Sequence, residues 1–411
     1  MIDHHHRLSA LPRSIDLRVI GRNRSFLAFV GLAITAILYD RLFFNYYQAF
    51  LLDDGNVALI AEKFLHGERP FIEFEPGYGI LWFFPITLLL KIFGVKFYLV
   101  RTYFLVLGLE SSLLAHGLLL RLTNSYLVAF ATALVVLLFP GCLYQTYIPF
   151  LVIAGAYVLL IYDPKTLAPC VPSWAAVTCN GLYLGLAYLI RSDIATVYLV
   201  LFLGYQGLLA LRASIRERRG LTLLLLLPRL AGVVLVAGLV GLVFALEAKS
   251  EGYLEGFLRQ YWALPGSLIS LLQQRFLTEP SARAAVTYTL WPRPSVLSFF
   301  SSSGEQGLIF LTYFPILAFV LISLFLIAEL LKRSMDAKGI SDFIAERANL
   351  LVLTGCSAAA FPQFFVWRPD LPHLAGFVPG FVVLMAYFLF LLKERVSVPT
   401  SLDTGRRWKF L

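Results

Sequence analysis

The stretch GILWFFPITLLLKIFG runs from Gly79 to Gly94, and whether it crosses a membrane decides the orientation of every later helix. Its uncharged core, Ile80–Leu90, is shorter than the roughly 20 apolar residues that a membrane-spanning helix requires. Pro85 also interrupts the run, because proline lacks the N–H group that continues a helix. We therefore expect a short helix that lies at the membrane interface and does not cross it.

The composition of the chain is that of a membrane protein. Of its 411 residues, 59% are hydrophobic and only 14% are charged, and the mean hydropathy is +0.77. Long apolar runs recur from Phe26 to Leu392, whereas a transmembrane barrel shows short alternating segments. The net charge of +9 does not indicate nucleic acid, because basic residues of membrane proteins gather in cytoplasmic loops. These features predict an all-α polytopic membrane protein without a nucleic-acid partner.

Outside Gly79–Gly94, the apolar runs predict about ten membrane-spanning helices. They are Ser25–Asn45, Phe97–Leu120, Ser125–Tyr144, Pro149–Tyr162, Trp174–Ile190, Ile194–Leu211, Leu230–Leu246, Leu308–Leu331, Leu350–Trp367 and Leu374–Leu392. The run Pro149–Tyr162 is short, so it needs the residues before it to reach across a bilayer.

Charge on the loops decides the predicted orientation. If Gly79–Gly94 lies flat, the main basic clusters all fall on one side of the membrane. These clusters are Arg7–Arg24, Arg212–Arg229, Lys332–Arg347 and Lys393–Lys409. If Gly79–Gly94 crosses, the clusters fall on both sides, against the positive-inside rule. We therefore expect an integral membrane protein with both termini in the cytoplasm. A bacterial inner (plasma) membrane is the expected location.

This orientation divides the chain into three parts. A basic cytoplasmic tail (1–24) precedes a single transmembrane domain (25–392), and a second basic tail (393–411) follows. The outer face then carries a first loop (46–96) and a long loop (247–307). Because the polar outer segments lie together, we expect the active site on the periplasmic or outer face.

An acidic pair, Asp53 and Asp54, directly follows the first predicted span. Neighbouring carboxylates repel each other, and such a pair suits a general base or a divalent metal site. The alternative is a pair of solvated acids that cap a helix starting at Asn56, since aspartate is a good helix cap. Further along the same loop, Glu73 and Glu75 return to the membrane edge.

Other ionisable residues are predicted at the outer ends of later spans. They are Arg101, Arg191, Asp193, Arg368, Asp370 and His373. Arginine binds phosphate in a two-pronged way, so a cationic cluster beside carboxylates suits a lipid-phosphate donor. The alternative is that the two aspartates serve only as ion-pair partners of the arginines. Glu110 and His116 lie within a span, where ionisable groups are costly and often functional.

The segment LLDDGNVALIAEKFLHGERPFIEFEPGYGILWFFPITLLLKIFG and the following LVRTYFLVLGLESSLLAHGLLLRL resemble the opening of the GT-C superfamily of membrane glycosyltransferases. The most similar branch includes the protein O-mannosyltransferases and the lipid A aminoarabinose transferases. An acidic pair after the first span, an amphipathic helix, a PGYG turn, a second interfacial helix and Arg101 occur in the same order. The later segments GLYLGLAYLIRSD and WRPDLPHLAGFVPG also look like family elements.

The resemblance implies a polyprenyl-phosphate sugar donor and a lipid, glycan or protein acceptor, with inversion at the sugar. It implies that the acidic pair supplies the base, with Asp53 the first candidate and Asp54 the second. The predicted donor-phosphate residues are Arg101, Arg191, Arg368 and His373, and the supporting acids are Glu73, Glu75, Asp193 and Asp370. Whether the acidic pair binds a divalent metal ion is left undecided by the sequence, because arginines can neutralise phosphate without a metal.

Three other classes of function compete with this interpretation. A membrane acyltransferase needs a histidine embedded in the membrane, and His116 is a poor candidate because the predicted orientation puts it toward the cytoplasmic half. A transporter or flippase of lipid-linked saccharides needs polar residues near the midplane, where the sequence offers Glu110 and His116. A noncatalytic polysaccharide-assembly protein needs no catalytic carboxylate. Substitution of Asp53 and Asp54 separates the enzyme from such a scaffold.

Overall fold

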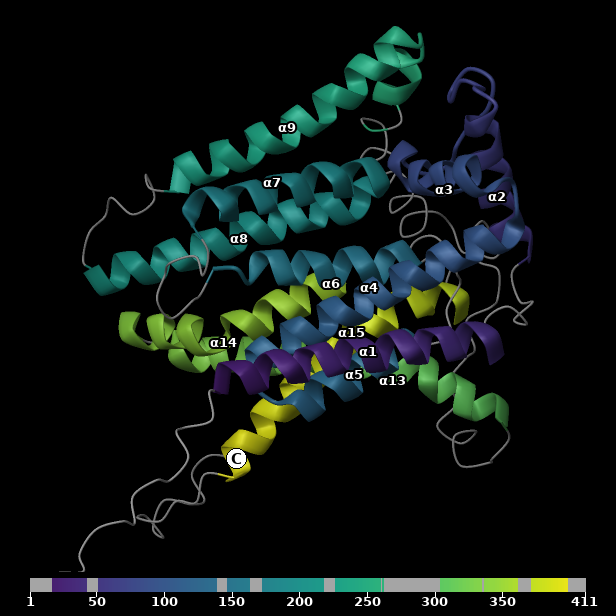
Figure 1. The fold of residues 1–411 in the computed structure, drawn as a ribbon. Coiled ribbons are helices and arrows are strands. Elements are labelled where there is room, and N and C mark those ends of the chain that lie inside the picture. The colour runs from purple at the N-terminus through teal and green to yellow at the C-terminus, as the bar shows by residue number, and fades with distance from the viewer. Residues whose placement is uncertain are drawn as a thin grey trace, which may run out of the picture.

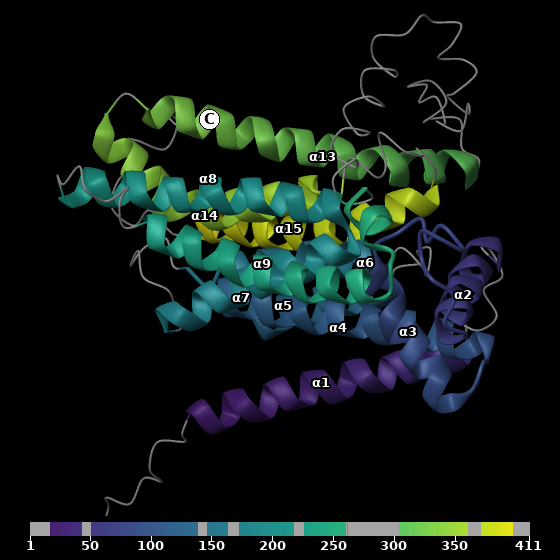
Figure 2. The same cartoon turned by 90° about the horizontal axis from the view of Figure 1, so that it is seen from above.

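A computed structural model describes residues 17–42, 51–138, 146–162, 172–217, 226–259, 261, 304–334, 336–360 and 371–397. These residues form helices joined by turns, and no β-strand occurs among them. The helices run along a common direction as an elongated bundle, except α2 and α3 at one end (Figures 1 and 2). The expected all-α class is therefore confirmed for the described part of the chain.

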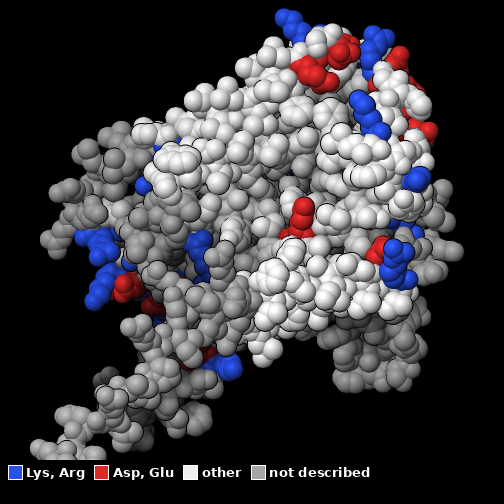
Figure 3. Space-filling view, viewed as in Figure 1, with Lys and Arg blue, Asp and Glu red and all other residues white. Residues whose placement is uncertain are grey.

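Seven described helices are long and apolar enough to cross a membrane. They are α1 (Leu17–Leu42), α4 (Phe97–Thr123), α7 (Ser173–Ile190), α8 (Ser192–Glu217), α9 (Leu226–Ser250), α13 (Gly304–Arg333) and α15 (Leu371–Ser397). Each contains or overlaps one of the predicted spans. Lys, Arg, Asp and Glu gather at the two ends of the visible face, and its middle is almost uncharged (Figure 3). This distribution is expected for an integral membrane protein.

The three remaining predicted spans correspond to shorter or more polar helices, so the total of about ten stays a prediction. Two of them, α5 (Tyr126–Leu138) and α6 (Tyr147–Leu159), have 13 residues each. The third, α14 (Ala337–Ala358), begins well before the predicted start at Leu350. Its start is set by Asp336, whose side chain accepts a hydrogen bond from the Gly339 N–H.

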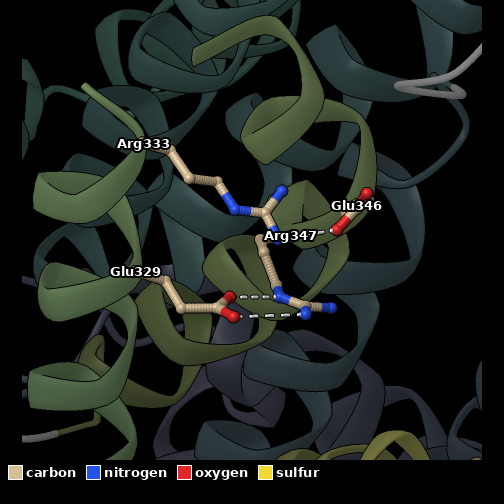
Figure 4. A network of polar contacts seen from close by, with 4 residues as sticks. All are labelled: Glu329, Arg333, Glu346 and Arg347. Carbon is tan, nitrogen blue, oxygen red and sulfur yellow. Dashed lines mark hydrogen bonds and ion pairs between the residues drawn. The ribbon is translucent and has the colours of Figure 1, made fainter. Parts of the chain in front are cut away.

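Two ion pairs join α13 to the first half of α14 (Figure 4). Arg347 Nε lies 2.5 Å from Glu329 Oε2, and both side chains are mostly buried. Arg333 Nη2 lies 3.0 Å from Glu346 Oε2, nearer to solvent. Two of the charges in the first half of α14, Glu346 and Arg347, are therefore neutralised by residues of α13. Hydropathy missed this part of the helix because it carries charged residues.

Residues 51–96, which fall within the first loop predicted for the outer face, form two helices at one end of the bundle (Figures 1 and 2). At 14 residues, α3 (Ile80–Phe93) is about 21 Å long at 1.5 Å per residue, short of a bilayer core of about 30 Å. This length agrees with the interfacial helix expected over Gly79–Gly94. Its partner α2 (Leu51–Leu65) begins at Leu51 and not at Asn56, so Asp53 and Asp54 belong to its first turn instead of preceding it.

The predicted amphipathic face of α2 packs against protein. Val57 and Ile60 are buried, Phe64 contacts the Phe83 and Phe84 rings of α3, and Leu59 is exposed. The helix ends at Leu65, and the turn that follows it contains Gly67, whose φ of 77° is readily adopted only by glycine. The loop is thus a packed part of the fold.

Helices α7 and α9 approach closely through glycines. A Cβ atom added to Gly181 would lie 2.6 Å from Val236 Cβ, and one added to Gly185 would lie 2.9 Å from Val240 Cβ. The two glycines have the GxxxG spacing that lets membrane helices pack backbone to backbone.

We expect Gly181→Leu to push α9 away from α7 and to destabilise the protein by about 1–3 kcal/mol through overpacking. The matched control is Gly207→Leu on α8, because a Cβ at Gly207 meets open space. Thermal unfolding of the two purified variants in detergent makes the comparison. Equal midpoints for both variants would contradict the proposed close contact.

Candidate functional site

The site is organised by a contact between the first outer loop and the corner that joins α7 to α8. A Cβ atom added to Gly79 would lie only 1.9 Å from the Leu189 carbonyl oxygen and 2.7 Å from that of Ile190. Only glycine fits there, because any larger residue would collide with the last turn of α7. This contact brings the start of α3 to the C-terminal end of α7, more than a hundred residues later in the sequence.

Tyr261 fixes the same contact by binding one backbone group from each helix end. Its hydroxyl accepts a hydrogen bond from the Ile80 N–H (3.1 Å) and donates one to the Leu189 carbonyl (3.0 Å). The first N–H groups and the last carbonyls of helices have no partner within the helix, and here one hydroxyl satisfies both. Tyr188 donates in turn to the Tyr261 carbonyl at 2.8 Å. Burial raises the pKa of Tyr261 above its usual range, so the hydroxyl keeps the proton that it donates.

An aromatic cluster lies directly behind this contact. Trp82 is fully buried and stacks on Tyr78, with ring centroids 4.4 Å apart. Its other neighbours are the Tyr147 ring at 4.5 Å and the Arg191 guanidinium carbon at 5.9 Å from the ring centre. The Trp82 indole N–H is buried and has no hydrogen-bond partner among the described residues. Buried donors normally have a partner, so this N–H is available to an oxygen atom of a ligand.

Arg191 is held in place by Asp193. Arg191 Nε lies 2.9 Å from Asp193 Oδ1 and Nη2 lies 2.5 Å from Oδ2, and both side chains are more than 90% buried. Such a two-pronged pair fixes the plane of the guanidinium. Asp193 also lies in the first turn of α8, where a negative charge is favoured by the helix dipole.

Arg101 lies near the start of α4. It is buried one turn before Phe104, whose ring centroid lies 6.1 Å from that of Tyr147. Residues three apart share a helix face, so Arg101 and Phe104 face the same side. Tyr103 donates to the Tyr147 hydroxyl at 2.5 Å, and Tyr147 donates to the Trp82 carbonyl at 2.9 Å. This chain of contacts connects α4, α6 and α3 beneath the outer loop.

The remaining predicted residues divide into two groups. Glu73 and Glu75 are exposed, and Glu73 pairs with Arg69 within its own turn, not with Arg101 or Arg191. Asp53, Asp54 and His373 lie on described helix backbone, but their side chains are outside the described part, as are Arg368 and Asp370 entirely. Among the described side chains, no group of His, Cys, Asp and Glu could hold a metal ion.

The turn that carries Glu73 is joined to the end of α9. Phe71 has a φ of 64°, which is uncommon for a large residue, and its ring lies 6.2 Å from that of Tyr253. A Cβ atom added to Gly256 would lie 2.2 Å from Phe71 Cβ. The turn around Phe71 is therefore packed against the segment that contains Tyr253 and Gly256.

Sequence reasoning predicted the charged residues of the cluster and missed its aromatic members. Trp82, Tyr147 and Tyr103 lie within apolar runs, where aromatic residues usually mean core packing. The sequence offered two weaker signals, the PGYG turn with Tyr78 and the aromatic-rich segment that begins RQYW at Arg259. Comparison with protein-family models, curated proteins and solved structures found no match to this chain.

We expect Tyr261→Phe to leave the Ile80 N–H and the Leu189 carbonyl unpaired and to cost about 1–3 kcal/mol for each buried group. Thermal unfolding in detergent measures the loss. Tyr98→Phe is the matched control, because the Tyr98 side chain is 53% exposed. If both variants unfold at the same temperature as the parent, Tyr261 does not join the two helix ends.

Proposed function

We propose that the protein is a membrane glycosyltransferase. It moves a sugar from a polyprenyl-phosphate-linked donor to a lipid, glycan or protein acceptor on the outer face, with inversion. The observation that carries this proposal is the buried Arg191 guanidinium, which Asp193 fixes and which lies over Trp82 of the first outer loop. Transfer of a sugar from a glycosyl phosphate needs positive charge near the phosphate and a base near the acceptor. Arg191 offers the charge, and the neighbouring loop carries the acidic pair Asp53 and Asp54.

The reaction requires three tasks of the protein. The acceptor hydroxyl has to lose a proton, the sugar has to be held in line, and the departing phosphate needs positive charge. Asp53 is the proposed base and Asp54 the second candidate. Their place in the first turn of α2 supports this assignment, because α2 packs on α3 and α3 packs on α7, which Arg191 follows directly.

Arg191 and Arg101 are the proposed cations for the phosphate, with Arg368 and His373 as further candidates. The fixed plane of the Arg191 guanidinium lowers the entropy that binding has to overcome. The free indole N–H of Trp82 adds a neutral donor for a phosphate or sugar oxygen. In this proposal Asp193 positions Arg191 and does not itself contact the donor.

The first test is mass spectrometry of envelope glycolipids and glycans from a deletion strain that carries the parent protein, Asp53→Asn or Asp54→Asn at equal level. We expect the deletion to lose one sugar mass from a product. The variant that removes the base should restore about 10²- to 10⁴-fold less product than the parent. Asp342→Asn is the control, because Asp342 is an exposed carboxylate of α14 outside the candidate site. Full restoration by both Asp53→Asn and Asp54→Asn would overturn the catalytic proposal.

The second test separates binding of phosphate from a purely structural ion pair. Arg191→Gln alone leaves Asp193 buried without its partner and should destabilise the protein by about 3–5 kcal/mol. The double variant Arg191→Gln/Asp193→Asn removes both charges and should regain most of that stability. We expect the double variant to fold but to restore no product in the mass-spectrometry assay described above. A stable and active double variant would show that Arg191 serves the fold alone.

A further inference from the structure

Polar side chains without hydrogen-bond partners lie around the start of α7, at the other end of that helix from Arg191. The hydroxyl of Tyr162 and both amide atoms of Gln206 are buried and have no partner among the described residues. Tyr162 is 1% exposed and Gln206 is 4% exposed. Buried donors and acceptors normally have partners, so these atoms indicate a ligand if they face one place. The proposed transfer reaction uses neither residue.

Gln206 faces the first turn of α7. The Tyr198 hydroxyl of α8 donates to Asn180 Oδ1 of α7 at 2.7 Å, and the two consecutive helices run antiparallel (Figure 1). Gln206 follows Tyr198 by about 12 Å along α8, and the same step back along α7 from Asn180 reaches the start of that helix. Gln206 is also rotated by about 80° from Tyr198, on the side away from Leu201, which contacts α14. The buried amide is therefore directed toward the start of α7.

Tyr162 reaches the same place from the end of α6. Tyr205, the residue before Gln206, donates to the Tyr162 carbonyl at 2.7 Å. This bond holds the segment after α6 beside α8. The ring of Tyr162 lies under a cation, because the Arg229 guanidinium carbon is 5.6 Å from the ring centre. The unpartnered hydroxyl is thus close to a positive charge.

Arg229 belongs to the first turn of α9, which lies at the same level. One turn later, a Cβ atom added to Gly232 would lie 2.7 Å from Val177 of α7, and Val177 is one turn from the start of its own helix. The two helices run parallel, so Arg229 is level with the first residues of α7. No carboxylate of the described residues forms an ion pair with Arg229.

The charges around this place favour an anion. Pro172 stands at the N-cap position of α7, and its side chain offers no acceptor to the first N–H groups of the helix. These N–H groups and the helix dipole attract negative charge, as does the guanidinium of Arg229. Residues 172–174 are exposed, and the Trp174 side chain is 74% exposed. A ligand can therefore reach the start of α7 from the surface.

We propose that Arg229, Tyr162, Gln206 and the first turn of α7 bind a phosphate group. Its oxygens accept hydrogen bonds from the guanidinium, the tyrosine hydroxyl and the amide nitrogen. The amide oxygen of Gln206 accepts from a hydroxyl or ammonium group next to the phosphate, which phospholipid headgroups and small phosphate esters both carry. The predicted orientation places this end of α7 at the cytoplasmic leaflet, where anionic lipids gather. The site is separate from the proposed glycosyl transfer at the other end.

Native mass spectrometry of the full-length, delipidated protein tests the lipid as the source of the phosphate. The probes are phosphatidylglycerol and the diacylglycerol with the same acyl chains. We expect the parent to retain the phosphatidylglycerol in preference. Arg229→Gln should weaken this preference about 10- to 100-fold, and Gln206→Leu and Tyr162→Phe about 2- to 10-fold each. Arg216→Gln is the control, because Arg216 is an exposed cation in the last turn of α8.

Glycerol phosphate tests the small phosphate ester as the source. A ligand that binds the folded protein raises its thermal midpoint. If the ester raises the midpoint of the delipidated parent and not that of Arg229→Gln, while the two lipids are retained equally, the site binds a soluble phosphate ester. A preference for phosphatidylglycerol that Arg229→Gln removes assigns the site to the lipid.

Three results would overturn the proposal. The first is a parent that shows neither the lipid preference nor the rise in midpoint. The second is an equal loss in Arg229→Gln and Arg216→Gln, which would show a general effect of charge. The third concerns Asp163, which directly follows Tyr162 in the sequence. If Arg229→Gln and Asp163→Asn lower the midpoint of the ligand-free protein equally, the chain's own carboxylate occupies Arg229.

The ligand-free midpoint also separates a binding role from a structural one. Gln206→Leu and Tyr162→Phe remove buried polar groups that have no partner in the described part of the chain. We expect both variants to unfold at the midpoint of the delipidated parent or above it, because no hydrogen bond is lost. Lower midpoints for both would show that the two side chains serve the fold and would contradict the proposed site.

Discussion

The close approach of Gly79 to the Leu189 carbonyl is the constraint on which the outer end of the molecule depends. It leaves no room for a side chain, so the first loop enters α3 directly against the last turn of α7. The Tyr261 hydroxyl can then satisfy one backbone group from each helix end. The same contact places Trp82 beneath Arg191, which makes the cation and the first loop parts of one site.

Buried arginines within the bundle are neutralised by ion pairs with nearby carboxylates. Arg191 with Asp193 at the outer end and Arg347 with Glu329 near the other end are both two-pronged and mostly buried. Buried pairs of this kind add little to stability but are costly to break. Both pairs orient their arginine side chains, and the Arg191–Asp193 pair lies against the Trp82 ring, whose indole N–H has no partner among the described residues. This contact is why the outer pair, and not the inner one, is assigned to function.

The sequence allowed the helices to be predicted better than the site. Hydropathy was enough to predict α3 as a short separate helix, because length acts locally. The expected interruption at Pro85 was wrong, since α3 continues through that residue. The start of α14 was missed, because its charged first half is stabilised by ion pairs with α13 that only the fold reveals. The roles of Tyr261 and Trp82 could not be predicted, since their contacts join segments far apart in the chain. The prediction of Glu73 and Glu75 as site residues rested on proximity in sequence, and in the structure both are exposed at the rim.

The central claim is that the outer cluster binds the phosphate of a polyprenyl lipid. Native mass spectrometry of the purified protein with a bacterial polyprenyl phosphate, and with the corresponding polyprenol, tests it without knowledge of the sugar. The account predicts that the parent retains the phosphate form in preference to the alcohol, and that Arg191→Gln/Asp193→Asn loses this preference. Equal retention of both lipids by the parent would contradict the account.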